Sequence, residues 1–187
     1  VVNNNLLNII DMIHYITLIS LVMLSNPIII FKFSEHTDLS LWQVVDDVVM
    51  GGRSQGYFDL NEDGNGVFKG EVSLANNGGF SSVRHRFKQK NISGATQILL
   101  RVKGDGQKYQ FRLKTHKNDN HAYVFHFTTS NDWETIQIDL KEMYPVFRGR
   151  LLDLPNYSAK EIGEISLMIA NKKAQKFQVL IDEIIIQ

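Results

Sequence analysis

Hydrophobic and polar residues alternate along most of the chain from residue 41 onward. The clearest alternating segments are residues 66–74, 98–103, 108–115, 135–140 and 177–181. A period of two residues predicts half-buried strands of an antiparallel sheet. We expect about ten such strands, separated by turns rich in Gly, Asn and Asp. The pattern therefore predicts an all-β domain over residues 39–187, an antiparallel β-sandwich or barrel.

Helical periodicity is weak throughout this region. Residues 158–163 allow one short helical turn. We expect under about a tenth of the domain to be helical.

The N-terminal part of the chain, residues 1–38, follows a different pattern and forms an apolar segment. Residues 12–31 contain no Asp, Glu, Lys or Arg, over roughly the 20 residues that a bilayer-spanning helix needs. We expect a helix here that packs little against the sandwich, serving as a signal peptide or a membrane anchor. Two alternatives stay open: a buried N-terminal helix, or an over-extended start preceding Met12. Membrane association or export is favoured, with a cytoplasmic location if the chain starts at Met12 or later.

Composition narrows the classes of function. The formal net charge is zero, whereas proteins that bind nucleic acid usually carry a basic excess, so we expect no nucleic-acid partner. The chain has no cysteine, which excludes disulfides, thiolate zinc sites and a cysteine nucleophile.

The segment DDVVMGGRSQGYF, residues 46–58, is the most unusual stretch. It is not a phosphate-binding P-loop, because no Lys-Ser/Thr pair follows the glycines and a strand pattern comes next. The adjacent carboxylates Asp46 and Asp47 point to opposite faces of an extended chain, which argues against an acid/base pair. We interpret the segment as a shaped turn in which Asp47 bonds nearby backbone or joins a buried ion pair.

No other constellation in the sequence supports catalysis. The six histidines are not spaced as metal ligands, and there is no G-x-S-x-G elbow around a nucleophilic serine. We expect a protein that is not an enzyme and that uses no metal and no cofactor.

Five segments in chain order resemble the complex I intermediate-associated protein 30 family: LWQVVDDVVMGGRS, GVFKGEVSLANNGGFSSVRHRF, LLRVKGDGQKYQFRL, WETIQIDLKEMYPVFRGR and EISLMIANKKAQKFQVLIDEI. The resemblance covers residues 41–187. It implies a galactose-binding-like jelly roll and a non-catalytic role, since mitochondrial members assist assembly of NADH:ubiquinone oxidoreductase. The chain departs from the family at Val48, where a glycine is usual, at Gln175-Lys176 and at Asn171. These departures alter loop chemistry and leave the expected fold unchanged.

The resemblance also marks positions expected to form a binding surface. They are Asp47, Met50, Gly51, Gly52, Ser54, Gly79, Phe80, Ser82, Arg84, Asp105, Arg148, Gly149 and Arg150. We further expect the 46–54 loop to lie against the 78–86 strand, with Asp46 or Asp47 within salt-bridge reach of Arg84 or Arg148.

Two functions fit these features. The first is a binding or assembly module for a protein partner, with respiratory complex I subunits as candidates and with membrane association through residues 12–31. The alternative is a carbohydrate-binding module, which needs exposed aromatic rings for stacking. The candidate rings are Tyr57, Tyr109, Tyr123, Trp133, Tyr144 and Tyr157.

Overall fold

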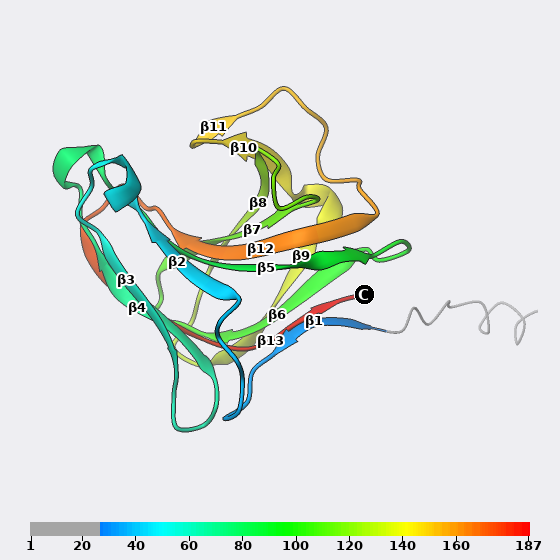
Figure 1. The fold of residues 1–187 in the computed structure, drawn as a ribbon, viewed down its shortest axis with the longest axis horizontal. Coiled ribbons are helices and arrows are strands. Elements are labelled where there is room, and N and C mark those ends of the chain that lie inside the picture. The colour runs from blue at the N-terminus through cyan, green and yellow to red at the C-terminus, as the bar shows by residue number, and fades with distance from the viewer. Residues whose placement is uncertain (1–26) are drawn as a thin grey trace, which may run out of the picture.

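The computed structural model of the protein describes residues 27–187, and within them the chain forms two packed antiparallel sheets (Figure 1). Thirteen strands occur within these residues, in this order: β1 (Ile28–Lys32), β2 (Trp42–Asp46), β3 (Gln55–Leu60), β4 (Gly66–Val72), β5 (Ser81–Asn91), β6 (Gln97–Lys103), β7 (Lys108–Lys114), β8 (Ala122–Thr128), β9 (Trp133–Asp139), β10 (Tyr144–Phe147), β11 (Arg150–Leu151), β12 (Glu161–Ile169) and β13 (Gln175–Ile186). Three short 3-10 helices complete this part of the chain: η1 (Asp47–Met50), η2 (Ala75–Asn77) and η3 (Leu140–Glu142). The predicted all-β sandwich is confirmed.

The two sheets differ in the number and order of their strands. The six-stranded sheet has the order β3-β4-β13-β6-β9, with β1 paired to the second half of β13. The seven-stranded sheet has the order β11-β10-β8-β7-β12-β5-β2. Strands far apart in sequence therefore become neighbours, because β12 lies between β5 and β7.

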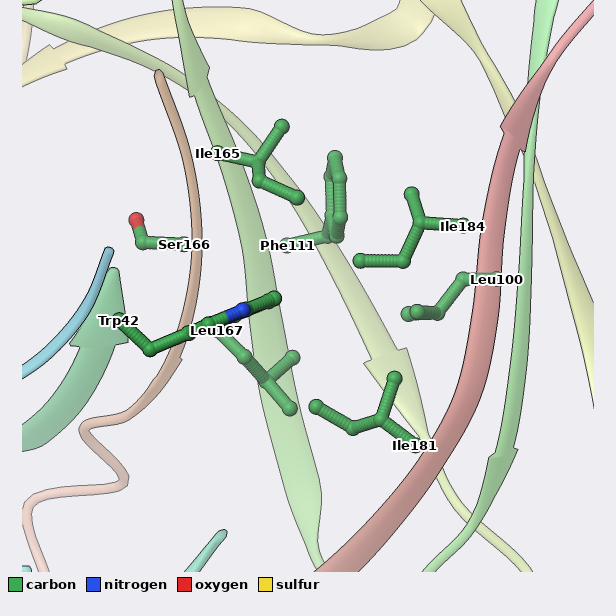
Figure 2. A pocket seen from close by; sticks show the side chains of 8 residues that line it. All are labelled: Trp42, Leu100, Phe111, Ile165, Ser166, Leu167, Ile181 and Ile184. Atoms are coloured by element: carbon green, nitrogen blue, oxygen red, sulfur yellow. The ribbon is translucent and has the colours of Figure 1, made fainter. Parts of the chain in front are cut away.

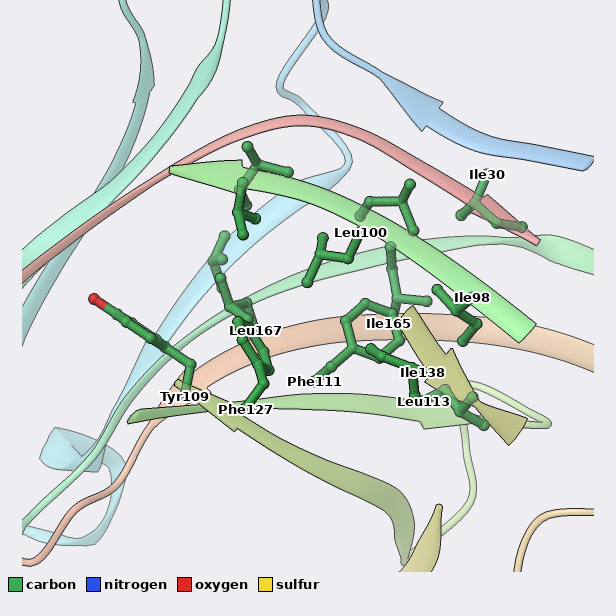
Figure 3. Close-up of a cluster of buried hydrophobic side chains, with 14 of the residues drawn as sticks. Ile30, Ile98, Leu100, Tyr109, Phe111, Leu113, Phe127, Ile138, Ile165 and Leu167 are labelled. Atoms are coloured by element: carbon green, nitrogen blue, oxygen red, sulfur yellow. The ribbon is translucent and has the colours of Figure 1, made fainter. Parts of the chain in front are cut away.

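The core fills the space between the sheets. Tyr109, Phe111 and Leu113 of β7 point inward at every second position, as a half-buried strand requires. They meet Ile98 and Leu100 of β6 from the opposite sheet (Figure 3). The alternation read from the sequence thus corresponds to one inner face and one outer face on each strand.

A small cavity remains inside this core, and it is not a ligand site. Figure 2 shows its apolar lining, which includes Leu100, Phe111, Ile181 and Ile184. Its volume of about 10 Å³ is at most that of one water molecule.

The end of the N-terminal apolar segment belongs to the sandwich. Residues 28–31, expected to be helical, instead form most of β1, which pairs with β13. Ile30 is buried at 6% exposure and Phe33 at 5%, so the sandwich begins before residue 39. Residues 12–26 of the expected helix lie outside the described residues. Within residues 27–187, no helix has the length and hydrophobicity needed to cross a membrane.

The expected helical turn at residues 158–163 is also wrong. Backbone pairing with β5 and β7 extends β12 from Glu161 to Ile169, so the second half of that segment is a strand.

Candidate binding site

The unusual 46–58 segment forms a tight turn at one end of the sandwich, beside η2 (Figure 1). Strand β2 ends at Asp46, and η1 follows at once. Gly51 closes the turn in the left-handed region, at φ 91°, where a glycine is favoured. The amide of Gly51 donates to the carbonyl of Val48 at 2.9 Å, and that of Gly52 donates to the carbonyl of Asp47 at 3.0 Å. The sequence prediction of a glycine-shaped turn is correct.

Asp47 is the buried centre of this turn, at 1% exposure. Its carboxylate accepts hydrogen bonds from the Ser54 amide at 2.9 Å and the Ser54 hydroxyl at 2.5 Å. It also accepts from the amides of Gly79 at 2.5 Å and Phe80 at 3.2 Å. Burial alone raises the pKa of Asp47, but these hydrogen bonds outweigh it and hold that pKa below its ordinary value. The ionised carboxylate therefore joins three segments of chain.

The glycines around Asp47 make room for the carboxylate. A Cβ built on Gly52 would overlap the Asp47 carboxylate, and one built on Gly78 would lie 2.5 Å from its Oδ2. These glycines thus allow close approach, a role that the family motif alone does not reveal.

Asp46 has a separate structural task. It accepts from the amide of Gly56 in β3 at 2.9 Å and from the hydroxyl of Ser81 in β5 at 2.5 Å. Because β3 and β5 belong to different sheets, Asp46 links the two sheets at this end. Both carboxylates are therefore engaged in fixing the turn.

The turn presents an apolar tip to solvent, formed by Val48, Val49 and Met50. Their exposed fractions are 58%, 73% and 70%, and the nearby Leu74 is 45% exposed. Asn76 of η2 donates from Nδ2 to the carbonyl of Gly51 at 3.0 Å, which ties η2 to the turn. Three consecutive exposed apolar side chains on a hydrogen-bonded base form a surface suited to binding rather than to chemistry.

The expected ion pair between these carboxylates and an arginine is wrong. Among residues 27–187, no salt bridge joins Asp46 or Asp47 to Arg84 or Arg148. Backbone amides exposed by the glycine turn occupy the Asp47 carboxylate instead. The expected packing of the 46–54 loop against the 78–86 strand is confirmed, because β2 pairs with β5 and Asp47 bonds both Gly79 and Phe80.

Two other groups of predicted positions lie away from the tip. Asp105 accepts from the Gln107 amide at 3.1 Å, the Tyr109 hydroxyl at 3.1 Å and the Gln178 amide at 2.8 Å, so it holds the β6–β7 turn to β13.

Arg148 and Gly149 form the two-residue turn between β10 and β11, with φ 47° and 76°. Arg148 lies 5.3 Å from the Phe147 ring centroid, and Arg150 is exposed.

Ser82 and Arg84 lie on the outer face of the seven-stranded sheet. The sequence pattern did not predict which side chains share this face. Arg112, Lys114 and Glu164 share this face. Glu164 is 3% exposed and pairs with Arg86 at 2.7 Å and Lys114 at 3.7 Å. Burial, together with the charge of Arg84, lowers the pKa of Arg112 to about 10. The alternation along each strand indicates whether a residue faces inward or outward. It does not indicate which strands lie side by side in the sheet.

Across the described part of the chain, no cluster of three or more His, Asp or Glu side chains is arranged to hold a metal ion.

Known proteins similar to this chain fall into two groups. The sequence profile of the family described as complex I intermediate-associated protein 30 matches residues 31–181. A curated mouse relative, complex I intermediate-associated protein 30, mitochondrial, is 23% identical over an alignment of 185 positions that covers 86% of this chain and 56% of the relative. The chain thus spans about half the length of that relative. The resemblance inferred from the sequence is confirmed.

Solved structures support the fold. A family 11 carbohydrate-binding module of a cellulosomal cellulase from Clostridium thermocellum superposes with a TM-score of 0.63 and 16% identity, covering 83% of this chain and 92% of that one. An agarase, AgWH50C, gives a TM-score of 0.56 and 14% identity, covering 86% of this chain and 24% of the enzyme. At these identities the likeness shows the jelly-roll fold alone.

Proposed function

The chain belongs to the complex I intermediate-associated protein 30 family, and we propose that it is a non-catalytic module that binds a protein partner during assembly of a larger complex. The partners we propose are subunits of a membrane complex such as complex I, the NADH:ubiquinone oxidoreductase. Complex I is the complex that appears in the name of the mouse relative. The binding positions we propose are the predicted motif residues around Asp47.

The apolar tip carries this proposal. Val48, Val49 and Met50 are exposed, yet the turn that displays them is fixed by hydrogen bonds to Asp47 and Asp46. A rigid apolar projection loses little conformational entropy on binding, which favours association with a complementary protein pocket. A catalytic role would need free titratable groups there, whereas both carboxylates already accept hydrogen bonds from the turn.

Carbohydrate binding is the competing function, and four of the six candidate aromatic rings disfavour it. Sugar recognition uses exposed rings as stacking platforms. Tyr109 and Tyr157 are buried, Tyr144 stacks on His126, and Arg101 lies over Trp133. Tyr57, at 58% exposure, is the most exposed tyrosine or tryptophan in the described part of the chain.

Affinity capture from native membranes tests the proposal. We compare the wild-type chain with the double variant Val49→Ser, Met50→Ser, using Leu154→Ser as the matched control because Leu154 is 49% exposed in the β11–β12 loop. We expect the same co-purifying protein with wild type and control, and a loss of at least about tenfold in the double variant, as for a central interface residue. Equal recovery with all three chains, or glycan-array binding without any protein partner, contradicts the proposal.

A further inference from the structure

The outer face of the seven-stranded sheet carries an unusual row of side chains. On β5, β12 and β7 the inward positions are mostly apolar, as Val83, Ile165 and Phe111 illustrate. The outward positions on the same strands are polar or charged except for Met168, because side chains alternate along a strand. In Figure 2 the Ser166 side chain points away from Ile165 and the core.

Strand register aligns two arginines across this face. Ser166 of β12 pairs with Arg84 of β5 on one side and with Arg112 of β7 on the other. The two arginines are therefore two strand spacings apart, about 10 Å between Cα atoms, with only a buried serine between them.

Neither arginine has a carboxylate partner within residues 27–187. Arg112 donates from Nη1 to Gln110 at 2.7 Å and contacts the sulfur of Met168 at 3.7 Å. Burial lowers the pKa of both arginines, and the charge of Arg84 lowers that of Arg112 further, while the carboxylate of Glu164 opposes the shift of each pKa. Two half-buried like charges that face each other would be stabilised by an anion between them.

The carboxylate of Glu164, in the neighbouring row, supplies only part of that negative charge, because it forms no direct ion pair with either arginine. Glu164 is already paired with Arg86 and Lys114. Together these outward positions form what we term the cationic face, made up of Arg84, Arg86, Lys108, Arg112 and Lys114 around the buried carboxylate of Glu164. The net positive charge calls for a ligand that carries carboxylates.

The cationic face is continuous with the apolar tip. Strand β2 runs into the tip at Asp46, and β5 leaves it at Ser81, so Ser82 lies just after Phe80, which bonds Asp47. A ligand that contacts the tip can therefore continue onto the face.

We propose that the cationic face binds an acidic segment of the protein partner, with Arg84 and Arg112 each receiving a carboxylate. A guanidinium matches the geometry of a carboxylate in two-point contact. The inference rests on the proposed function only in taking the ligand to be a protein. An acidic glycan is the other source of carboxylates, and the face disfavours it because the Tyr144 ring is already stacked on His126, 6.2 Å between centroids.

The test uses a short fluorescein-labelled peptide with Glu at alternate positions and a matched peptide with Gln in place of Glu. Fluorescence anisotropy at low salt gives the dissociation constants. We expect the Glu peptide to bind and the Gln peptide not to. Arg84→Gln and Arg112→Gln should each weaken binding about tenfold or more, the value of one lost charged hydrogen bond.

Arg101→Gln is the matched control. It removes the same charge from the opposite sheet, where Arg101 pairs with Asp182 at 3.0 Å. Because Arg112→Gln could unfold the sheet, the side-chain Nε–Hε NMR signals of Arg84 and Arg112 in the wild-type chain provide a second readout. Both signals should shift on addition of the Glu peptide.

Several results would overturn the inference. They are no binding of the Glu peptide, equal weakening by Arg101→Gln, unmoved arginine signals, or tighter binding of tetragalacturonate that displaces the peptide. The proposed function can fail on its own. If the wild-type chain captures no protein partner but still binds the Glu peptide, the protein-assembly role is contradicted and carboxylate binding by the cationic face is not. Protein capture without peptide binding contradicts the inference alone.

Discussion

Ser54 donates two hydrogen bonds to Asp47, one from its amide at 2.9 Å and one from its hydroxyl at 2.5 Å. The same hydroxyl accepts from the Ser73 amide at 3.0 Å, which extends the network to the end of β4. This pair joins the start of η1 to the strand that follows the turn. The shape of the apolar tip therefore depends on two buried polar side chains rather than on apolar packing.

Asp47→Ala should lower the free energy of unfolding by about 3 kcal/mol, because it leaves several buried donors without an acceptor. Urea unfolding followed by fluorescence measures this change. Glu62, in the β3–β4 turn, is exposed. The control variant Glu62→Ala should therefore change the free energy of unfolding by only about 0.5 kcal/mol or less. An Asp47→Ala variant as stable as wild type contradicts the central role of Asp47.

The two adjacent glycines should respond differently to alanine. Gly52→Ala places a Cβ against the buried Asp47 carboxylate and should cost at least about 2 kcal/mol by breaking its network. Gly51→Ala has open space around it, so it should cost only the left-handed backbone strain, about 1 kcal/mol. Thermal melts of both variants check the order, and a larger loss for Gly51→Ala would reverse our assignment of their roles.

Acid should weaken the fold through Asp47. Hydrogen bonds hold the pKa of Asp47 below its ordinary value despite burial. A carboxyl with a lowered folded pKa stabilises the fold above its unfolded pKa, about 4, and that contribution disappears as pH falls through the folded pKa. Unfolding free energies measured from neutral pH down into the acid range should fall there more steeply for wild type than for Asp47→Asn. Parallel curves for the two chains are the contrary result.

Glu164 should matter more for stability than a half-buried acid in a similar pair. Glu164→Gln removes a carboxylate that is 3% exposed and leaves Lys114, whose side chain is 17% exposed, and the exposed Arg86 without a carboxylate partner, which should cost about 3 kcal/mol. Asp182→Asn breaks the pair with Arg101, whose side chain is 43% exposed while that of Asp182 is 29% exposed. Because that pair is partly solvated, its loss should cost at most about 1 kcal/mol. Guanidinium unfolding compares the two, and equal losses would mean that burial of Glu164 has no energetic consequence.

The fold was predictable because the alternation is strong on strands such as β7, where one face is buried and the other is polar. Strand β1 was not, because four of its five residues form the apolar run IIIF, in which helix and strand look alike. Its strand character comes from pairing with β13, at the other end of the chain.

The site was predictable only in part. The glycine pattern correctly indicated a shaped turn around Asp47, but its acceptor role depends on Gly79 and Phe80, which lie far along the chain on the other side of β3 and β4. The Arg84–Ser166–Arg112 row arises from the register of three strands that are not consecutive in sequence. Sequence alternation gives the face of each residue but not the neighbouring strand.

Contact between the apolar tip and a protein partner can be detected by site-specific cross-linking. A photoreactive benzophenone side chain replaces Val49 in one chain and Leu154 in another, and both are irradiated in native membranes. We expect one protein adduct from position 49, the same protein that affinity capture recovers, and no such adduct from position 154. Adducts with lipid alone at position 49, or the same protein adduct from both positions, would contradict binding of a protein partner at the tip.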